Sequence, residues 1–233
     1  MNESWWKKSV VYQIYPKSFK DTTGNGKGDL QGIIEKLDYI KNLGADVIWI
    51  TPIYESPQKD NGYDISDYYK IDPQYGSMDA FERLLTQAHA RGLKIILDMV
   101  VNHTSIEHAW FKKSSQSKDS PYRDFYIWKD GKDNTYPNNW KSKFGGSAWK
   151  YDENSKQYYL HLFDVTQADL NWENQELRKS IYDMMDFWLS KGVDGFRLDV
   201  INLLSKDQVF PNDTLNTPIE DGRKFYTDGP KIH

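Results

Sequence analysis

The sequence predicts an α/β fold in which short parallel strands alternate with amphipathic helices. Apolar runs of strand length alternate along the chain with stretches whose apolar residues recur every three or four positions. Each helical stretch is followed by a glycine that can end it. The strand-like runs are apolar on both faces, as parallel strands are when helices cover both sides of the sheet.

Four apolar runs are the expected strands, and three amphipathic stretches are the expected helices between them. The strands cover residues 10–15, 46–51, 94–101 and 195–201, and the helices cover residues 30–43, 78–90 and 174–190. A closed eight-stranded barrel needs roughly 250 residues without any insertion. Because four strand-and-helix units and an insertion use all 233 residues, we expect half of such a barrel.

The alternation is interrupted after the third strand. Residues 104–170 are polar, aromatic and rich in turn-forming residues, with a mobile surface loop expected at 114–120 and a strand at 158–163. We therefore predict a first part of the main domain at 1–103, a small inserted domain at 104–170, and a continuation of the main domain at 171–233.

The composition excludes several classes of function. The chain has 30 Lys and Arg against 34 Asp and Glu, so no global positive field would attract nucleic acid or anionic lipid. It has no cysteine, which excludes disulfides, thiolate nucleophiles and cysteine metal sites. No run approaches 18 apolar residues and no signal-peptide core follows the first lysines, so we expect a cytoplasmic protein without a membrane partner. Aromatic residues make up 15% of the chain, which favours stacking on hydroxylated ligands such as sugars.

Charged residues in the fourth predicted strand form the first candidate site. Arg197 and Asp199 alternate with Phe196 and Leu198, so both charges point to one face of an otherwise buried strand. An Asp beside a buried Arg is ionised and oriented, as a carboxylate nucleophile must be. An internal ion pair that only closes the sheet is the alternative.

Two further places lie at the carboxyl ends of predicted strands, where α/β folds bind their ligands. Asp98 lies in the third strand, and Asn102 and His103 follow it. The segment 60–64 follows the second strand, and on local grounds it is a turn.

The glycine-rich loop at 21–29 has the oxygen spacing of a calcium loop. The expected ligands are Asp21, Thr23, Asn25, the Lys27 carbonyl and Asp29. The loop departs from the EF-hand because Gly32 stands at position twelve, where that motif has a bidentate Glu. We therefore expect one structural Ca²⁺, which Mg²⁺ could replace, and a metal-free turn is the alternative. The five histidines have no paired spacing, so no catalytic zinc is expected.

Six segments together show a family resemblance that covers essentially the whole chain. They are WWKKSVVYQIYPKSF, GDLQGIIEKLDYIKNLGADVIWITPIYESP, DNGYDISDY, DMVVNHTS, QADLNW and GVDGFRLDV. In order and spacing they resemble the α-amylase superfamily, glycoside hydrolase family 13, and within it the oligo-1,6-glucosidase branch. The resemblance implies the N-terminal half of a (β/α)8 TIM barrel with a small α+β domain inserted after the third strand.

The resemblance also implies catalytic roles. Asp199 matches the nucleophile that attacks the anomeric carbon, and Arg197 matches the residue that keeps its carboxylate ionised. Asp98 matches the acid that braces this arginine. Val200 matches a position where this branch carries valine when it prefers α-1,6 bonds or trehalose-type substrates, whereas from the residues alone it belongs to the core.

Substrate-binding roles are implied for residues in the loops. Asp60, Tyr63 and His103 match the positions that hold the terminal glucose, with Tyr63 stacked under the ring. Phe144, Phe163 and Gln167, in the inserted domain, match residues at the rim of the cleft.

The implied reaction is hydrolysis of an α-glucoside with retention. The segments LHLFDVTQADLNWEN, SKDQ, FPN and DGRKFYTDGP resemble the branch of the family that hydrolyses trehalose 6-phosphate to glucose and glucose 6-phosphate. Isomaltose-type ends cleaved by an oligo-1,6-glucosidase and a non-catalytic sugar-binding remnant are the alternatives. Retention needs a second carboxyl group as general acid. The family's acid follows the fifth strand, and Glu220 and Asp221 lie in a loop without strand pattern. We therefore expect this chain to be inactive alone, to self-associate, or to need a missing C-terminal half.

Overall fold

A computed structural model of the chain describes residues 4–133 and 135–213, which form two compact units. The first unit contains the residues up to Ser56, Asp67–Met99 and Tyr182–Asp199. The second contains Pro57–Ser66, Val100–Ile181 and the residues from Val200 on. The predicted boundaries at 103/104 and 170/171 stay a prediction, and the acids at 220 and 221 lie outside the described residues.

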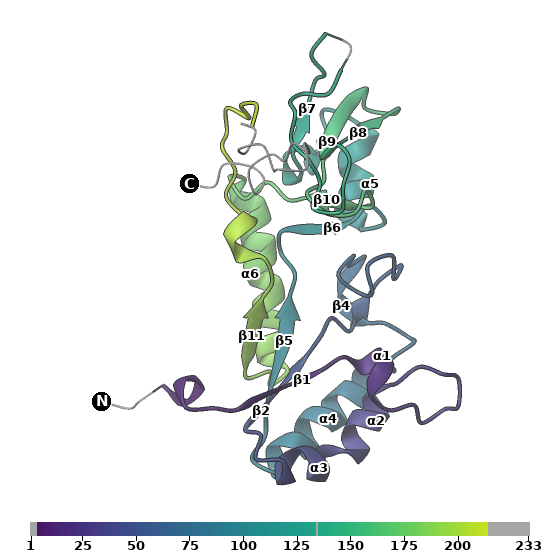
Figure 1. The fold of residues 1–233 in the computed structure, drawn as a ribbon, viewed down its shortest axis with the longest axis vertical. Coiled ribbons are helices and arrows are strands. Elements are labelled where there is room, and N and C mark those ends of the chain that lie inside the picture. Colours follow the sequence, from purple (N-terminus) through teal and green to yellow (C-terminus); the bar gives the residue numbers. More distant parts are fainter. Residues whose placement is uncertain (1–3, 134, 214–233) are drawn as a thin grey trace, which may run out of the picture. The chain divides into compact units, whose positions relative to one another are not determined.

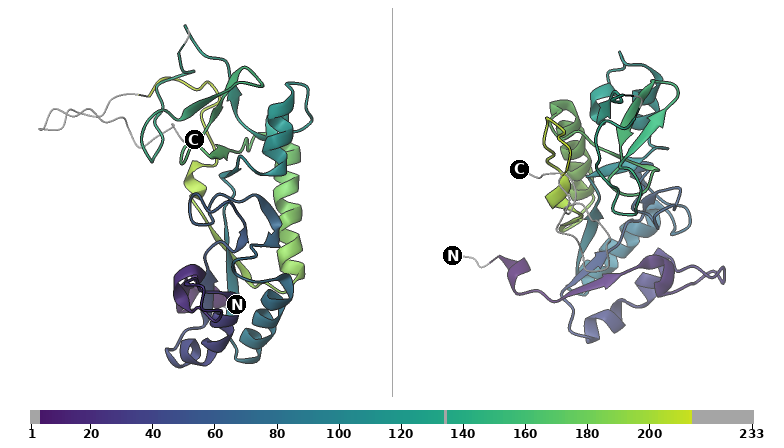
Figure 2. Two further views of the ribbon diagram at one scale, coloured as in Figure 1. Left: turned by 90° about the vertical axis from the view of Figure 1, so that its right-hand side faces the viewer. Right: turned by 45° about the horizontal axis from the view of Figure 1, so that its top comes forward.

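The first unit is built on a four-stranded parallel sheet. Its strands, in spatial order, are β1 (Val11–Ile14), β2 (Val47–Ile50), β5 (Lys94–Met99) and β11 (Gly195–Leu198) (Figure 1). All four predicted strands are therefore confirmed, each somewhat shorter than expected. Figure 2 shows the same elements from two further directions.

Helices follow the strands as an α/β fold requires. They are α1 (Pro16–Phe19), α2 (Leu30–Glu35), α3 (Leu37–Asn42), α4 (Met78–Ala90) and α6 (Gln175–Ser190). The predicted helix at 78–90 is confirmed at both ends, because the Ser77 hydroxyl caps its first turn and Gly92, with a φ of 66°, lies just beyond its end. The single helix expected at 30–43 was wrong: Lys36, with φ −108° and ψ 4°, divides it into two.

The core of the first unit centres on Trp188 of α6, which is fully buried. Its indole nitrogen donates to the Tyr68 carbonyl at 2.9 Å, and its ring lies edge-on to Tyr54 and Phe81. Tyr54 and Tyr68 belong to a small hairpin of β3 (Tyr54–Glu55) and β4 (Asp67–Ile71). The indole thus joins the hairpin to the helices that cover the sheet.

Asp194 ties the start of β11 to its neighbour β5. Its carboxylate accepts hydrogen bonds from the Ile95 backbone nitrogen at 2.8 Å and from Lys94 Nζ at 3.1 Å, and His89 Nε2 lies 2.8 Å away. Burial acts to raise the pKa of Asp194, but these three partners outweigh it and lower the pKa. The ionised form of Asp194 therefore stabilises the fold.

We expect Asp194→Asn to lower the free energy of unfolding by about 1–3 kcal/mol at neutral pH, because the charged acceptor is lost. Since the folded-state pKa is depressed, this contribution is present above the unfolded value of about 3.9 and is lost as the pH falls through the folded pKa. Urea denaturation at neutral pH and below pH 4 measures it. A difference between the two proteins that does not shrink in acid would contradict the assignment.

The second unit is α+β. Its sheet has the antiparallel order β7 (Trp128–Lys129), β9 (Gln157–Leu160) and β8 (Trp149–Asp152). A second pair joins β6 (His103–Ser105) to β10 (Gln167–Asp169), and α5 (Ala109–Gln116) precedes the sheet. Short 3-10 helices cover Arg123–Phe125 and Ile201–Leu203 in this unit, and a further one covers Trp5–Lys7 in the first unit. The strand expected at 158–163 is confirmed in part, since β9 ends at Leu160.

The prediction of a surface loop at 114–120 was wrong for its first residues, because α5 ends at Gln116. Ser114 lies within α5 and is fully buried. Its hydroxyl donates to the Arg123 carbonyl and accepts from the Trp128 indole nitrogen at 2.8 Å. In the sequence, a buried serine with two hydrogen-bond partners cannot be distinguished from a serine in a polar loop.

The described residues leave two edges of the parallel sheet open, β1 and β11. Apolar side chains on these edges are exposed, including Val11 at 49% and Leu198 at 42%. The buried strand expected around Leu198 is wrong for this side chain. For half of a barrel we also expect the first and fourth strands to present unpaired edges and exposed apolar faces, and this is confirmed among the described residues, where β11 pairs with β5 alone. Among the described residues, no helix is long and apolar enough to cross a membrane.

Candidate functional site

Three charged residues meet at the carboxyl end of the parallel sheet in the first unit. The parallel register places Arg197 of β11 directly opposite Asp98 of β5, and Asp199 follows β11. Arg197 Nη1 lies 3.0 Å from Asp98 Oδ1 and 2.5 Å from Asp199 Oδ1. One guanidinium nitrogen therefore bridges both carboxylates, which the sequence could only suggest.

The indole of Trp49 also belongs to this cluster. Trp49 Nε1 donates to Asp98 Oδ2 at 3.1 Å, and the Arg197 guanidinium lies 4.7 Å from the centre of the Trp49 ring. Burial acts to lower the pKa of Arg197, but its two carboxylate partners, Asp98 first, outweigh it and raise the pKa. The arginine therefore keeps its charge, and the Asp199 carboxylate has a fixed orientation.

Backbone strain follows directly after Asp199. Val200 has φ 38° and ψ 37°, the left-handed conformation that a β-branched residue rarely adopts. Such strain persists only where the surroundings impose it, and it occurs often at functional sites. The side chain of Val200 is partly buried against the aromatic core of the second unit, which agrees with the expectation that it belongs to a core.

A second polar cluster lies within the second unit. Gln167 Nε2 donates to Asp60 Oδ2 at 2.8 Å and lies 3.2 Å from His103 Nε2. Partial burial raises the pKa of Asp60, although the hydrogen bond from Gln167 and the nearby His103 oppose the shift. Asp60, His103 and Gln167 are thus brought together from three separate segments.

Aromatic side chains continue this cluster. The Phe163 ring lies 5.1 Å from the His103 ring, and Phe144, which is 59% exposed, lies 5.7 Å from Phe163. The Tyr63 backbone nitrogen donates to the Asp60 carbonyl at 3.0 Å. All six predicted binding residues of the second unit therefore belong to one connected group.

The segment 60–64 is also a turn, as local reasoning expected. The buried Asp64 carboxylate accepts the backbone nitrogens of Lys59 and Asp60, and Asn61 and Gly62 both have positive φ. A turn at 60–64 is compatible with the predicted binding role, because Asp64 holds the loop in which Asp60 and Tyr63 lie.

The loop at 21–29 closes on Asp21. This carboxylate accepts backbone hydrogen bonds from Thr23, Gly24 and Gly26, and these donors, Gly26 first, lower its pKa. The Asp29 carboxylate accepts hydrogen bonds from the backbone nitrogen and the hydroxyl of Thr22. It also accepts from the Gly32 backbone nitrogen, and Asp29 is therefore the N-cap of α2. The loop is therefore held by its own hydrogen bonds.

The donor types nevertheless fit a hard cation, which prefers carboxylate, amide, hydroxyl and carbonyl oxygens. In the part of the chain that the structure describes, no three His, Cys, Asp or Glu side chains group closely enough to hold a metal. A cation here would need Thr23, Asn25 and the Lys27 carbonyl beside the two carboxylates. Gly32 cannot be the EF-hand Glu, because a Cβ there would lie 2.1 Å from the Lys20 carbonyl oxygen.

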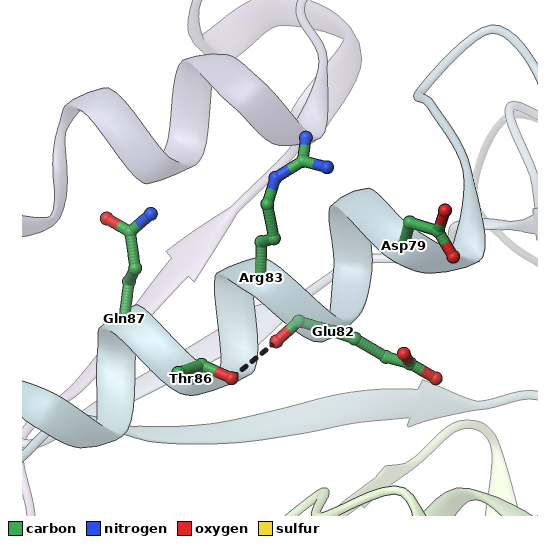
Figure 3. A pocket seen from close by; sticks show the side chains of 5 residues that line it. All are labelled: Asp79, Glu82, Arg83, Thr86 and Gln87. Atoms are coloured by element: carbon green, nitrogen blue, oxygen red, sulfur yellow. Dashed lines mark hydrogen bonds between the residues drawn. The ribbon is translucent and has the colours of Figure 1, made fainter.

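A surface hollow elsewhere in the first unit carries no comparable chemistry. Its lining is one exposed face of α4, and Figure 3 shows Asp79, Glu82, Arg83, Thr86 and Gln87 along it. Thr86 Oγ1 only bonds back to the Glu82 carbonyl at 2.9 Å. We assign no role to this hollow.

Sequence reasoning missed one residue of the second unit. Lys206 is almost fully buried, and its Nζ lies 3.0 Å from both Asn102 Oδ1 and Asp169 Oδ1. Lys206 lies in the segment SKDQ that carries part of the resemblance, but the sequence predicted no role for it, because a single lysine after a short helix normally faces solvent.

A parallel sheet that carries a carboxylate–arginine–carboxylate cluster at its carboxyl edge, with a small α+β domain inserted after the third strand, defines the class: an α/β protein with part of a (β/α)8 barrel. The α-amylase catalytic-domain family matches residues 13–233. The chain belongs to that family.

Individual relatives are similar over nearly all of this chain. A trehalose-6-phosphate hydrolase of Bacillus subtilis is 70% identical over 230 residues, which are 98% of this chain and 40% of the relative. An oligo-1,6-glucosidase of Heyndrickxia coagulans is 62% identical over 231 residues, 98% of this chain and 42% of the relative. A crystal structure of Bacillus licheniformis trehalose-6-phosphate hydrolase matches with a TM-score of 0.90 and 68% identity over 98% of this chain and 40% of that one. The chain thus spans about 40% of the length of these relatives.

Proposed function

We propose that this chain is part of a retaining α-glucoside hydrolase whose substrate is trehalose 6-phosphate. The observation that carries the proposal is the Asp199 carboxylate held by Arg197 at the end of β11. In the proposed reaction, an Asp199 oxygen bonds to the anomeric carbon while the glycosidic bond breaks, and water later releases the glucose with the original configuration. A trehalose-6-phosphate hydrolase is 70% identical to the chain, which supports the choice of substrate.

The second cluster suits the proposed glucose site. Asp60, His103 and Gln167 offer a carboxylate, an imidazole and an amide, and aromatic rings adjoin them. Such a combination binds sugar hydroxyls by hydrogen bonds and the apolar sugar face by stacking. Water-soluble substrates of this kind agree with a cytoplasmic location, which stays a prediction.

An oligo-1,6-glucosidase is the second candidate, because a relative of that name is 62% identical over 98% of the chain. The deciding experiment compares kcat/KM of a full-length protein that carries these residues on trehalose 6-phosphate and on isomaltose. We expect glucose and glucose 6-phosphate from the first substrate with at least a tenfold preference. Preference for isomaltose would establish the second candidate, and glucose binding without turnover would indicate a sugar-binding protein.

The 233 residues expressed alone should hydrolyse neither substrate. In the first unit, the carboxylate beside Asp199 is Asp98, which Arg197 and Trp49 already hold. Both of these partners donate to Asp98, so it serves them as an acceptor and is not placed as the general acid that the leaving oxygen needs, whose contribution is about 10²–10⁴-fold. Product assays on the purified chain test this. Turnover that Asp199→Asn abolishes would show that another residue of this chain supplies the proton.

Calcium should stabilise the protein through the loop at 21–29. At a concentration about 100-fold above Kd, an ion bound only by the folded state should raise Tm by roughly 5–10 °C. Thermal melts in EDTA, calcium and magnesium measure the effect. Asp21→Asn should abolish the response, whereas Asp38→Asn, on the exposed surface, should keep it. The same Tm in EDTA and in calcium would contradict the calcium site and support the alternative, a turn that binds no metal.

A further inference from the structure

A buried amide supports the carboxylate of Asp60 in the second unit. It belongs to Gln167, which is fully buried at the start of β10, whereas Asp60 is only partly buried. A ligand in solution can therefore reach the Asp60 carboxylate but not the Gln167 amide. The Gln167 amide nitrogen donates to Asp60 Oδ2 at 2.8 Å, so the buried side chain holds the accessible one directly.

The backbone at residue 164 determines which way this amide points. The Asp164 backbone nitrogen can only donate, and it lies 2.8 Å from the Gln167 oxygen, so that oxygen must face it. A reversed amide would place nitrogen against this donor and oxygen against the Asp60 carboxylate. Asp164 is itself held in a turn, because its carboxylate accepts from the Thr166 backbone nitrogen at 2.8 Å and from the Thr166 hydroxyl at 2.6 Å. The orientation of Gln167 therefore follows from its partners rather than from the assignment of atoms.

The groups around Asp60 act in both directions on its protonation. Partial burial raises the pKa of Asp60, and the carboxylates of Asp64, in the same turn, and of Asp164 raise it further. The hydrogen bond from Gln167 and the nearby His103 lower this pKa. Because the Gln167 amide does not titrate, its hydrogen bond favours the charged form of Asp60 at every pH.

We propose that Gln167 is a positioning residue: its fixed amide keeps the Asp60 carboxylate ionised and oriented to accept a hydrogen bond from a hydroxyl of the substrate sugar. The contact with the sugar rests on the proposed function, whereas the control of Asp60 does not. An amide that only joined β10 to the turn at 60–64 would contribute to stability without setting the charge of Asp60. A titration of Asp60 separates these two roles.

Two substitutions at position 167 change the charge of Asp60 in the same direction. Gln167→Met removes the donor but keeps the length of the side chain, so Asp60 should bind its proton about tenfold more tightly. Gln167→Glu is the second variant, in case the first does not fold. Its new carboxylate can still accept from the Asp164 backbone nitrogen, while its other oxygen faces Asp60. The two carboxyl groups then share one proton, and Asp60 should titrate at a still higher pH.

Carbon-13 NMR of protein labelled at the aspartate carboxyl carbon follows this titration, with Asp60 assigned by its loss in Asp60→Asn. We expect its midpoint to move to higher pH in Gln167→Met and further in Gln167→Glu. Gln157→Met is the control, because Gln157 Nε2 donates to Asp130 Oδ1 at 2.9 Å, and it should leave the Asp60 midpoint unchanged. An unchanged midpoint in a folded variant at 167, or an equal shift in the control, would overturn the proposal.

Kinetics of a full-length protein that carries these residues test the contact with the sugar separately. In Gln167→Met the acid limb of kcat/KM should move to higher pH, because it reports the ionisation of the free enzyme. At neutral pH, a carboxylate without a fixed orientation should raise KM about three- to tenfold, with kcat nearly unchanged. A shifted Asp60 midpoint with constant KM and acid limb would retain Gln167 as the residue that sets the charge of Asp60 but exclude the contact with the sugar. If the wild type acts on no α-glucoside, the proposed function fails while the NMR result stands.

Discussion

Asp199→Asn should reduce kcat by roughly 10⁴- to 10⁶-fold, the loss found when a covalent nucleophile is removed from other enzymes. The substitution keeps the size of the side chain but removes the charge that attacks the anomeric carbon. Arg197 Nη1 would still find an oxygen at this position, so the fold should be retained. The measurement is kcat on trehalose 6-phosphate or isomaltose for a full-length protein that carries the chain.

A control variant and a folding check show whether a loss of kcat comes from the missing Asp199 charge. Asp38→Asn removes a carboxylate that is 77% exposed and paired with Arg91, and it should leave kcat unchanged. Circular dichroism and Tm should show that Asp199→Asn remains folded. Activity within tenfold of the wild type would reject Asp199 as the nucleophile and favour the internal ion pair that the sequence left open.

Arg197→Met should impair both stability and turnover. It leaves Asp98, which is fully buried, with Trp49 as its described hydrogen-bond donor. Breaking a buried pair costs about 3–5 kcal/mol, and because the Arg197 side chain is 35% exposed we expect about 2–3 kcal/mol from urea denaturation. The freed Asp199 carboxylate loses its orientation, which should lower kcat by roughly 10²-fold.

Arg91→Met is the matched control for this second result. Arg91 also holds a carboxylate, at 2.7 Å from Asp38, but this pair is exposed and screened by solvent. Its loss should leave the free energy of unfolding and kcat nearly unchanged. If the two substitutions changed the free energy of unfolding and kcat equally, the position of Arg197 between Asp98 and Asp199 would contribute to neither stability nor turnover.

Much of the first unit could be predicted because its signals are local. A buried parallel strand needs a run of apolar residues, and a helix on a sheet needs an apolar stripe and a stop, as in α4. The cap at Ser77 and the glycine beyond Ala90 explain why both ends of that helix were correct. The break at Lys36 was missed because it changes the backbone without interrupting the apolar stripe that Leu37 and Ile40 continue.

The second unit was harder to predict because its elements are short and depend on distant partners. The strands β6 and β10 have three residues each and exist through pairing with one another. Ser114 became a buried helical residue because Arg123 and Trp128 supply its partners. The six binding residues that the structure joins into one group were named through the family resemblance, because no local pattern relates segments that are so far apart in the chain.

The sequence by itself determined the fold class, the family and the residues at the ends of the strands, since periodicity, turn residues and motif spacing are properties of the chain. Only the tertiary structure decided how those residues act on one another. It placed one nitrogen of Arg197 between two carboxylates and buried Lys206 against Asn102 and Asp169. Hydrogen bonds depend on distance and direction between segments as far apart as residues 102 and 206, and no local pattern encodes that geometry.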